Sequence, residues 1–202
     1  MLLPYLEPDR LEAGCDEAGR GCLCGPVVAA AVILPKDYAN GLINDSKQLS
    51  SKIRETLALE IKSNATTWAI ASASPEEIDK INILNASFLA MNRAVEALKI
   101  LPEHLLIDGN RFKSYLSTPF DCIIGGDGKY ASIAAASILA KVHRDSLMND
   151  YAKEFPGYGW ETNFGYATRQ HRQGIVELGT TAIHRKSFRL LPEQLEIEFP
   201  LT

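Results

Sequence analysis

Apolar and polar positions along the chain predict short strands early and alternating strands and helices later. Residues 11–16 form a short apolar segment, and residues 26–34 are nearly continuous apolar, as expected for a buried strand. Glycines at positions 19, 21 and 25 separate the two segments, which favours a hairpin connection. Further strands are predicted over residues 66–73, 104–108 and 120–124.

Apolar residues at helical spacing predict the helices. Residues 50–64 and 83–100 show this spacing, and Ser74 followed by Pro75 is typical of a helix start. The other predicted helices are residues 131–151 and 168–178, with a loop over residues 155–165 between them. Early strands in hairpin order, followed by strands alternating with helices, predict one α/β domain with a mixed sheet flanked by helices.

Length and composition place the chain among ordinary globular proteins. Its 202 residues are 46% hydrophobic and 23% charged, enough for a core that needs no disulfide or structural metal. The apolar runs are too short for a membrane helix, and the N-terminal residues lack the basic region and apolar core of a signal peptide. We therefore expect a cytoplasmic protein without membrane association. The cysteines lack metal or redox spacing, and three of the four are expected in core strands or at their margins: they are Cys15, Cys22, Cys24 and Cys122.

Charge is unevenly distributed. The formal net charge of −4 argues against a non-specific nucleic-acid coat. Residues 164–189 nevertheless contain a single acid, Glu177, and five basic residues, Arg169, Arg172, Arg185, Lys186 and Arg189. We predict that this basic segment follows the phosphates of a bound partner, although a solvated helix face explains the pattern equally well.

Three apolar segments end in carboxylates. Asp16 and Glu17 follow the first predicted strand, Asp108 ends another, and Asp127 lies between glycines before a helix. Singly, these residues suit an exposed turn, an Asp-Gly turn and a helix N-cap. Jointly, strands of one sheet bring their ends together, and clustered carboxylates bind Mg²⁺ or Mn²⁺. Because adjacent strand residues face opposite ways, Asp16 and Glu17 both reach such a site only if the strand bends.

Seven segments, in the same order and over nearly the whole chain, resemble the ribonuclease HII family, the type 2 ribonucleases H. They are DEAGRG within residues 15–21, DSKQLS at 45–50, INILNA at 81–86, IDG at 107–109, GD and AAASILAKV within 126–142, GY-x-T with histidine at 165–171, and HRKSF at 184–188. Cys22 and Cys24 replace the proline and alanine that are commoner in the first motif, so altered packing is expected there.

The resemblance implies a ribonuclease H-like fold and an endonuclease. The expected domain spans residues 1–202, with residues from about 155 to 202 as a C-terminal helical extension that grips the substrate. The enzyme would hydrolyse the RNA strand of RNA–DNA hybrids and cleave 5′ of ribonucleotides embedded in duplex DNA, as in ribonucleotide excision. Two Mn²⁺ or Mg²⁺ ions would drive the hydrolysis, leaving 3′-hydroxyl and 5′-phosphate ends.

The resemblance also implies roles for individual residues. The catalytic and metal-binding residues would be Asp16, Glu17, Asp108 and Asp127. The ribose 2′-hydroxyl would be read by Gly19, Arg20 and Gly21, and the RNA-to-DNA junction by Tyr166. Lys47 would also bind substrate, and Ser137 and Lys141 would lie near phosphates or pack the site.

Three alternative identities of the protein would require different features of the sequence. Ribonuclease HIII has an additional N-terminal domain, for which the ten residues before the first strand leave no room, and its signature differs at Arg20. A silent hybrid-binding protein gains nothing from four acids that repel one another without a metal. A Ca²⁺ or phosphate-sugar binding module does not require residues 165–166 and 184–188.

We expect a monomer whose partners are RNA–DNA hybrid and ribonucleotide-containing duplex DNA. Residues 192–202 lack a sliding-clamp motif, so no clamp partner is predicted.

Overall fold

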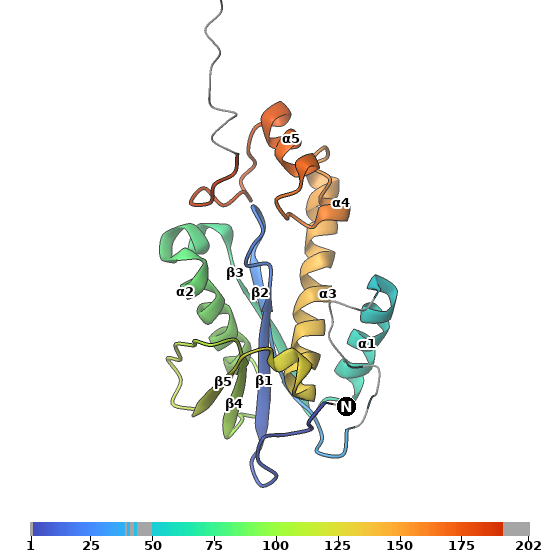
Figure 1. Ribbon diagram of the computed structural model, residues 1–202, viewed down its shortest axis with the longest axis vertical. Coiled ribbons are helices and arrows are strands. Elements are labelled where there is room, and N and C mark those ends of the chain that lie inside the picture. Colours follow the sequence, from blue (N-terminus) through green and yellow to red (C-terminus); the bar gives the residue numbers. More distant parts are fainter. Residues whose placement is uncertain (1, 39, 41–42, 44–49, 192–202) are drawn as a thin grey trace, which may run out of the picture.

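The computed structural model describes residues 2–38, 40, 43 and 50–191, and its centre is a five-stranded mixed sheet in the order β3-β2-β1-β4-β5 (Figure 1). β1 pairs antiparallel with β2, which pairs antiparallel with β3, whereas β4 runs parallel to both β1 and β5. The strands are β1 (Glu12–Ala18), β2 (Val27–Ile33), β3 (Thr67–Ala73), β4 (His104–Asp108) and β5 (Phe120–Ile123). The predicted mixed sheet is confirmed.

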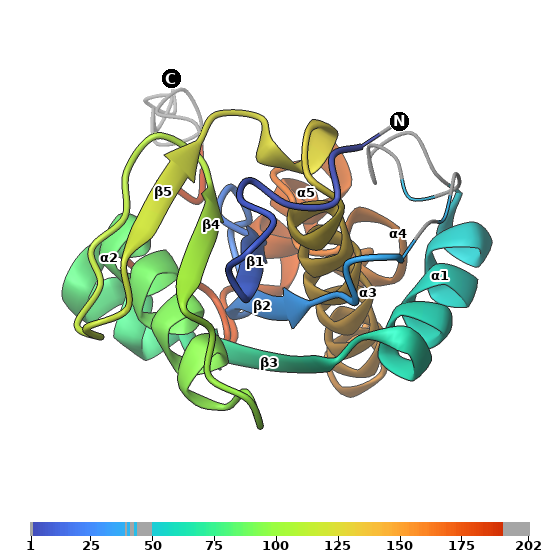
Figure 2. The same cartoon turned by 90° about the horizontal axis from the view of Figure 1, so that it is seen from below.

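Helices cover both faces of the sheet (Figure 2). Helix α2 (Pro75–Glu96) packs on one face, and α1 (Ser51–Asn64) and α3 (Ala131–Glu154) pack on the other. Alternate residues of β2 pack in two different cores. Val27 and Ala29 lie in the core beneath α2, and Val28 lies in the core beneath α1 and α3. Burial on both faces explains why this strand is a continuous apolar run in the sequence.

Helix α3 approaches β1 closely at Gly14. A Cβ atom there would lie 2.2 Å from the carbonyl carbon of Ser132 and 2.3 Å from the nitrogen of Ile133. Only glycine leaves room for this contact, because both neighbours are backbone atoms. The contact fixes the start of α3 against β1, two residues before Asp16.

Helix α2 contains a break at Asn82, which explains two separate start signals in the sequence. A capping box between Ser74 and Glu77 starts the helix. Asn82 then adopts a φ of 65°, and its Oδ1 accepts a hydrogen bond of 3.1 Å from the Asn85 amide. The second stretch therefore has its own cap, and it ends at Glu96 rather than at the predicted residue 100.

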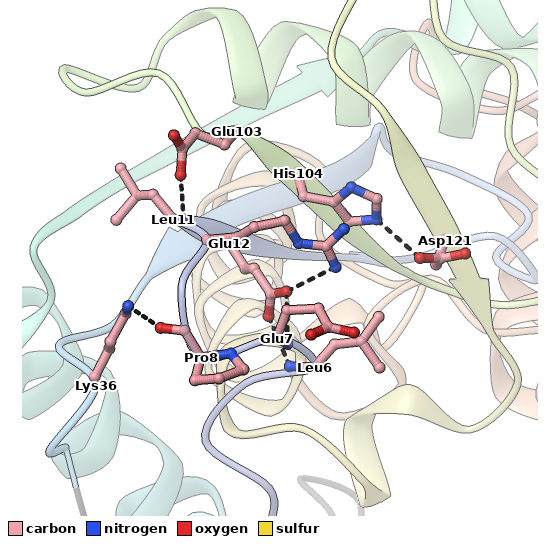
Figure 3. Close-up of polar contacts among 10 residues, drawn as sticks. Leu6, Glu7, Pro8, Leu11, Glu12, Lys36, Glu103, His104 and Asp121 are labelled. Atoms are coloured by element: carbon pink, nitrogen blue, oxygen red, sulfur yellow. Dashed lines mark hydrogen bonds and ion pairs between the residues drawn. The ribbon is translucent and has the colours of Figure 1, made fainter.

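The segment before β1 is fastened to the start of that strand, the end opposite the predicted carboxylates (Figure 3). The buried Glu12 carboxylate accepts hydrogen bonds from the amides of Leu6 and Glu7, at 2.7 and 3.0 Å, and from Arg10 at 3.1 Å. Nearby, Glu103 accepts from the Leu11 amide at 2.7 Å. These bonds provide partners for three backbone amides where the chain enters the sheet.

The C-terminal part forms a third core cluster around the end of α3. Trp160 and Met148 are fully buried there, beside Tyr158 and Ile175. The predicted loop over residues 155–165 contains a short helix, α4 (Trp160–Asn163), between left-handed residues Gly159 and Phe164. Helix α5 (Arg169–Leu178) follows and confirms the helix predicted over residues 168–178, with Thr168 as its N-cap. In the described part of the chain, every helix is too short or too polar to cross a membrane.

Candidate active site

A groove of about 440 Å³ opens at the carboxyl ends of β1 and β4. It brings together most of the residues predicted from the sequence, although they come from distant segments. Its lining consists of Asp16, Glu17, Ala18, Gly19, Arg20, Gly21, Arg54, Asp108, Ser137, Lys141 and Tyr166. Lys47 lies outside the described residues.

The sheet register explains how two adjacent acids face one groove. β4 pairs with β1 only as far as Cys15 opposite Ile107, so the β4-side edge of β1 is open from Asp16 onward. Asp16 shares the α3 face with Gly14 and is hydrogen-bonded to Ser137 of that helix. Glu17 faces the other way, yet its side chain reaches the groove past the open edge. Pairing of β1 with β2 continues to Ala18 opposite Val28, so the Glu17 side chain reaches the groove without a break in the β1–β2 pairing.

Asp108 and Asp127 approach each other through a short turn. The Asp108 side chain accepts a hydrogen bond of 2.7 Å from the Gly126 amide, which starts the 3-10 helix η2 (Gly126–Gly128). Asp127 is therefore adjacent to the residue that Asp108 binds, but it is only 7% exposed and does not appear in the groove lining. The structure places three of the four predicted carboxylates in the groove and the fourth beside it.

The negative charges of the groove carboxylates are energetically unfavourable. Burial raises the pKa of Asp16 well above its usual value, and the charges of Glu17 and Asp108 raise it further. Burial also raises the pKa of Glu17, although Arg20 opposes this effect. The protein thus holds acids at a position where their negative charges are unfavourable. A bound cation would relieve both the repulsion and the desolvation.

The donor set suits a hard divalent cation, because its side chains offer carboxylate oxygens. The oxygens are not preassembled: within the described residues, no three acid, histidine or cysteine side chains form a group that could hold an ion. Other hydrogen bonds engage them. Glu17 accepts from Arg20 Nη1 at 3.0 Å, and an Asp16 oxygen accepts from the Glu17 amide at 2.7 Å. Arg20 engages only Oε1 of Glu17 in this bond, so the second carboxylate oxygen, Oε2, could still bind a cation.

Among the described residues, the groove lining contains two cations besides Arg20. The first is Lys141, which the family resemblance predicts near phosphates or in the packing of the site. Its Nζ lies 2.7 Å from Asp145 and 4.9 Å from the centre of the Phe164 ring. Arg54 of α1 lies 3.9 Å from the same Asp145 and was not predicted. Nothing in the sequence distinguishes it from the other charged residues of α1, because only tertiary packing brings α1 beside α3.

Tyr166 stands on a tight turn supported by the two cysteines. It is 42% exposed and forms a β-bridge with Cys22. A Cβ on Gly165 would lie 2.9 Å from the Cys24 sulfur. Cys22 and Cys24 are fully buried, as predicted, and they pack beneath the turn that presents Tyr166.

A buried pair of histidines, His171 and His184, supports the turn that carries Tyr166. His171 Nδ1 lies 3.0 Å from the Tyr166 carbonyl and must donate to it, so His171 Nε2 is the acceptor for Trp160 at 2.9 Å. His184 Nδ1 accepts from the Thr181 amide at 2.9 Å, so its Nε2 carries the proton and donates to His171 Nε2 at 3.3 Å. These tautomers follow from the hydrogen bonds and require both rings to be neutral.

The histidine pair predicts loss of stability in mild acid. Burial lowers the pKa of both residues, that of His184 to about 4. Below pH 6.5, His184 of the unfolded chain binds a proton, whereas the buried His184 of the folded protein stays neutral until the pH approaches 4. The free energy of unfolding therefore decreases as the pH falls from 6.5 towards 4. The loss from His184 is at most about 3 kcal/mol. Urea unfolding of wild type and His184→Asn at several pH values measures it. Equal pH slopes for the two proteins would contradict the prediction.

The basic segment is only partly available for phosphates. Arg185 has an exposed fraction of 0%, so the prediction that it follows phosphates is wrong. Arg172 donates to the Leu190 carbonyl and is half-buried. Arg169, Lys186 and Arg189 remain exposed. The sequence pattern showed the charge of Arg185 but not its direction.

The fold and the strand-end carboxylates define a ribonuclease H-like α/β protein. Among solved structures, ribonuclease HII in the PCNA complex from Archaeoglobus fulgidus has a TM-score of 0.75 and 27% identity, covering 92% of this chain and 98% of that chain. Bst-RNase HIII in complex with Mn²⁺ has a TM-score of 0.67 and 20% identity, covering 93% of this chain but only 68% of that one.

Sequence comparison identifies the family. The family model described as Ribonuclease HII matches residues 13–191. Ribonuclease HII of Parabacteroides distasonis is 62% identical over 199 residues, which cover 98% of this chain and 100% of that protein. The chain belongs to the ribonuclease HII family and is a nuclease, a hydrolase. The predicted family, enzyme class and fold are confirmed.

Proposed function

We propose that this protein hydrolyses the RNA strand of RNA–DNA hybrids and cleaves 5′ of ribonucleotides embedded in duplex DNA. Membership of the ribonuclease HII family supports ribonuclease H activity on hybrids. The observation that carries the finer proposal is the groove itself. It places Asp16, Glu17 and Asp108 beside Gly19–Gly21 and Tyr166, so groups suited to phosphodiester hydrolysis adjoin groups suited to sugar recognition.

The proposed chemistry assigns the metal to the carboxylates. Asp16, Glu17, Asp108 and Asp127 would hold two Mn²⁺ or Mg²⁺ ions, which when bound activate water and neutralise charge on the phosphate. Cleavage would leave a 3′-hydroxyl and a 5′-phosphate. Should a cation draw Glu17 away from Arg20, the Arg20 guanidinium would become available to the neighbouring phosphate. Arg54 and Lys141 would neutralise phosphates along the groove, and Lys47 is proposed to do the same.

Selectivity must depend on the sugar, because the scissile phosphate is the same in DNA and RNA. The 2′-hydroxyl is the group that DNA lacks. Gly19, Arg20 and Gly21 would contact it through backbone groups, since glycines let the backbone approach a ligand closely. Tyr166 would pack on the next sugar, admitting deoxyribose and excluding an added hydroxyl at the RNA-to-DNA junction.

The same proposal covers the organisation of the protein. We propose one catalytic domain over residues 1–202, acting as a monomer in the cytoplasm, with residues from about 155 as its substrate-gripping extension. The exposed Arg169 and Lys186 would supply the grip, while the buried Arg185 has a different role. The Archaeoglobus relative forms a complex with PCNA. No clamp partner is proposed here, because residues 192–202 lack a clamp motif and lie outside the described residues.

Cleavage of a defined duplex tests the proposal. A labelled DNA duplex with one ribonucleotide is incubated with the protein in Mn²⁺, in Mg²⁺ and with excess chelator, and an all-DNA duplex serves as control. We expect one cut, 5′ of the ribonucleotide, in the presence of either ion and none with chelator. Ligation and phosphatase treatment identify the product ends. Cleavage of the all-DNA duplex at the same rate, or cleavage that persists in chelator, would refute the proposal.

Removing the Tyr166 ring should weaken cleavage at junctions selectively. Tyr166→Ala is expected to lose roughly tenfold more activity on a single embedded ribonucleotide than on a continuous hybrid, because only the junction sugar loses its packing partner; tenfold corresponds to about 1.4 kcal/mol. Tyr166→Phe keeps the ring and removes only the hydroxyl, so it is the matched control and should retain most activity. Rates on the two substrates measure the effect. An equal loss on both, in a folded protein, would remove Tyr166 from junction recognition.

A further inference from the structure

Arg185 is a fully buried cation directed at the loop between β1 and β2. Its guanidinium donates to three backbone carbonyls: Nη2 to Gly19 at 2.7 Å, Nη1 to Arg20 at 2.9 Å and Nε to Gly25 at 3.0 Å. The residue is separated from this loop by about 160 positions in the sequence. A buried charge is costly unless such bonds satisfy it, and the planar fork of arginine matches three convergent acceptors where a lysine does not.

A second buried arginine completes the surface behind the loop. Arg144 of α3 donates to the carbonyls of Cys24, Pro26 and Phe164. A Cβ on Gly19, whose φ is 99°, would lie 2.0 Å from Arg144 Nε. The loop is therefore pressed against two guanidinium groups, and its position is determined from inside the protein.

The bonds of Arg185 decide which backbone groups face the groove. The described chain contains no cis peptide bond, and in a trans peptide the carbonyl and the following N–H point in opposite directions. The Gly19 and Arg20 carbonyls point inward to Arg185. The amides of Arg20 and Gly21 consequently point away from it, and these same residues line the groove.

We propose that Arg185 is a positioning residue for ribose recognition, which fixes residues 19–21 as a surface of two amide donors, those of Arg20 and Gly21, for the 2′-hydroxyl oxygen. The inference rests on the proposed function and adds the direction of the hydrogen bonds and the residue that enforces it. Without Arg185 the two peptide groups are able to rotate. The loop would then present either backbone N–H donors or carbonyl acceptors to the sugar. Arg185 touches neither the phosphate nor the metal-binding acids.

Competition between two duplexes tests the proposal in the active enzyme. The KM is measured for a duplex with one ribonucleotide, and the Ki is measured for the identical all-DNA duplex as inhibitor. In Arg185→Lys and Arg185→Gln, the ratio of Ki to KM should fall roughly tenfold or more, since one or two hydrogen bonds to the hydroxyl are lost. A purely structural role would lower the fraction of active enzyme, and so the apparent kcat, without changing this ratio.

Asp79→Ala is the matched control. Asp79 of α2 accepts from the amides of Lys186 and Ser187, so its loss loosens the segment that carries Arg185 but removes no bond to the loop. We expect a lower melting temperature and an unchanged ratio. A ratio that falls equally in Asp79→Ala and in the Arg185 variants would overturn the inference, as would Arg185 variants with the wild-type ratio. Failure of the proposed function is distinct, because wild type would then not cleave the ribonucleotide duplex at all.

A measurement on wild type covers the case in which the Arg185 variants do not fold. Hydrogen exchange of the Arg20 and Gly21 amides is followed with the ribonucleotide duplex and with the all-DNA duplex, in the absence of catalytic metal. The proposal expects slower exchange of both amides with the first duplex only. Equal exchange with the two duplexes would refute it.

Discussion

Asp16→Asn is expected to abolish nuclease activity while leaving the protein folded. The substitution keeps the shape of the side chain and replaces its carboxylate with a neutral amide, so the proposed cation would lose a negatively charged ligand. Losing about 4 kcal/mol of transition-state stabilisation corresponds to roughly a thousandfold lower rate. Cleavage of the single-ribonucleotide duplex at saturating Mg²⁺ measures the loss. Activity within tenfold of wild type would contradict the role of Asp16.

The same variant should be more stable than wild type when no metal is present. Burial and the charges of Glu17 and Asp108 raise the pKa of Asp16. The folded state therefore binds the proton more tightly than the unfolded state, and the metal-free protein loses stability as the pH rises from the usual aspartate value through the raised one. Asparagine removes this penalty at neutral pH. Urea unfolding in chelator compares the two proteins, and a less stable variant would contradict the expected repulsion.

Asp127→Asn tests whether the site has four carboxylates or three. Asp127 is buried beside the groove rather than in its lining, so its proposed role as a metal ligand would require the turn at Gly126 to move. We expect the loss of activity to equal that of Asp16→Asn. Nearly full activity at saturating Mg²⁺ would reduce the set to Asp16, Glu17 and Asp108.

Gly14→Ala is expected to have the largest effect on stability. The added Cβ would lie 2.2 Å from a backbone atom of Ser132, and neither the central strand nor the start of α3 can move without disturbing the core on both sides. Overpacking costs about 1–3 kcal/mol where side chains are able to adjust, and here the obstacle is backbone. We therefore expect a loss of roughly 4 kcal/mol or more, measured by urea or thermal unfolding.

Gly128→Ala is the control for this prediction. A Cβ at Gly128 would meet no atom within 4 Å, and its backbone does not require glycine. Its stability should stay within about 0.5 kcal/mol of wild type. A Gly14→Ala protein as stable as the Gly128→Ala protein would show that β1 and α3 are able to separate.

Local signals in the sequence determined the secondary structure well. The continuous apolar run of β2 reflects burial on both faces, and Ser74 and Pro75 start α2 because their chemistry suits a helix N-terminus. The sequence showed two helix-start signals in α2 but not the left-handed residue Asn82 that separates them, and the short helix α4 escaped prediction. Helix α4 lies between the left-handed residues Gly159 and Phe164, whose conformation local spacing does not reveal.

The sequence by itself also indicated which residues carry the chemistry. Asp16, Glu17 and Asp108 were identified as strand-end acids, and the motifs around them identified the family. Their assignment as metal ligands stays a prediction, as do the roles of Asp127 and Lys47. A strand followed by an acid is a local feature, so it is visible in the chain without knowledge of the sheet.

Only the tertiary structure decided how those residues meet. The open edge of β1 beyond Cys15, which lets Asp16 and Glu17 share a groove, depends on the register with β4, nearly a hundred residues away. Arg54 enters the site because α1 packs beside α3, and Arg185 turns inward to the Gly19 and Arg20 carbonyls rather than outward to phosphate. Charge and periodicity are properties of neighbouring residues. The direction of a side chain and the partner it meets are set by packing between distant segments, which no local pattern contains.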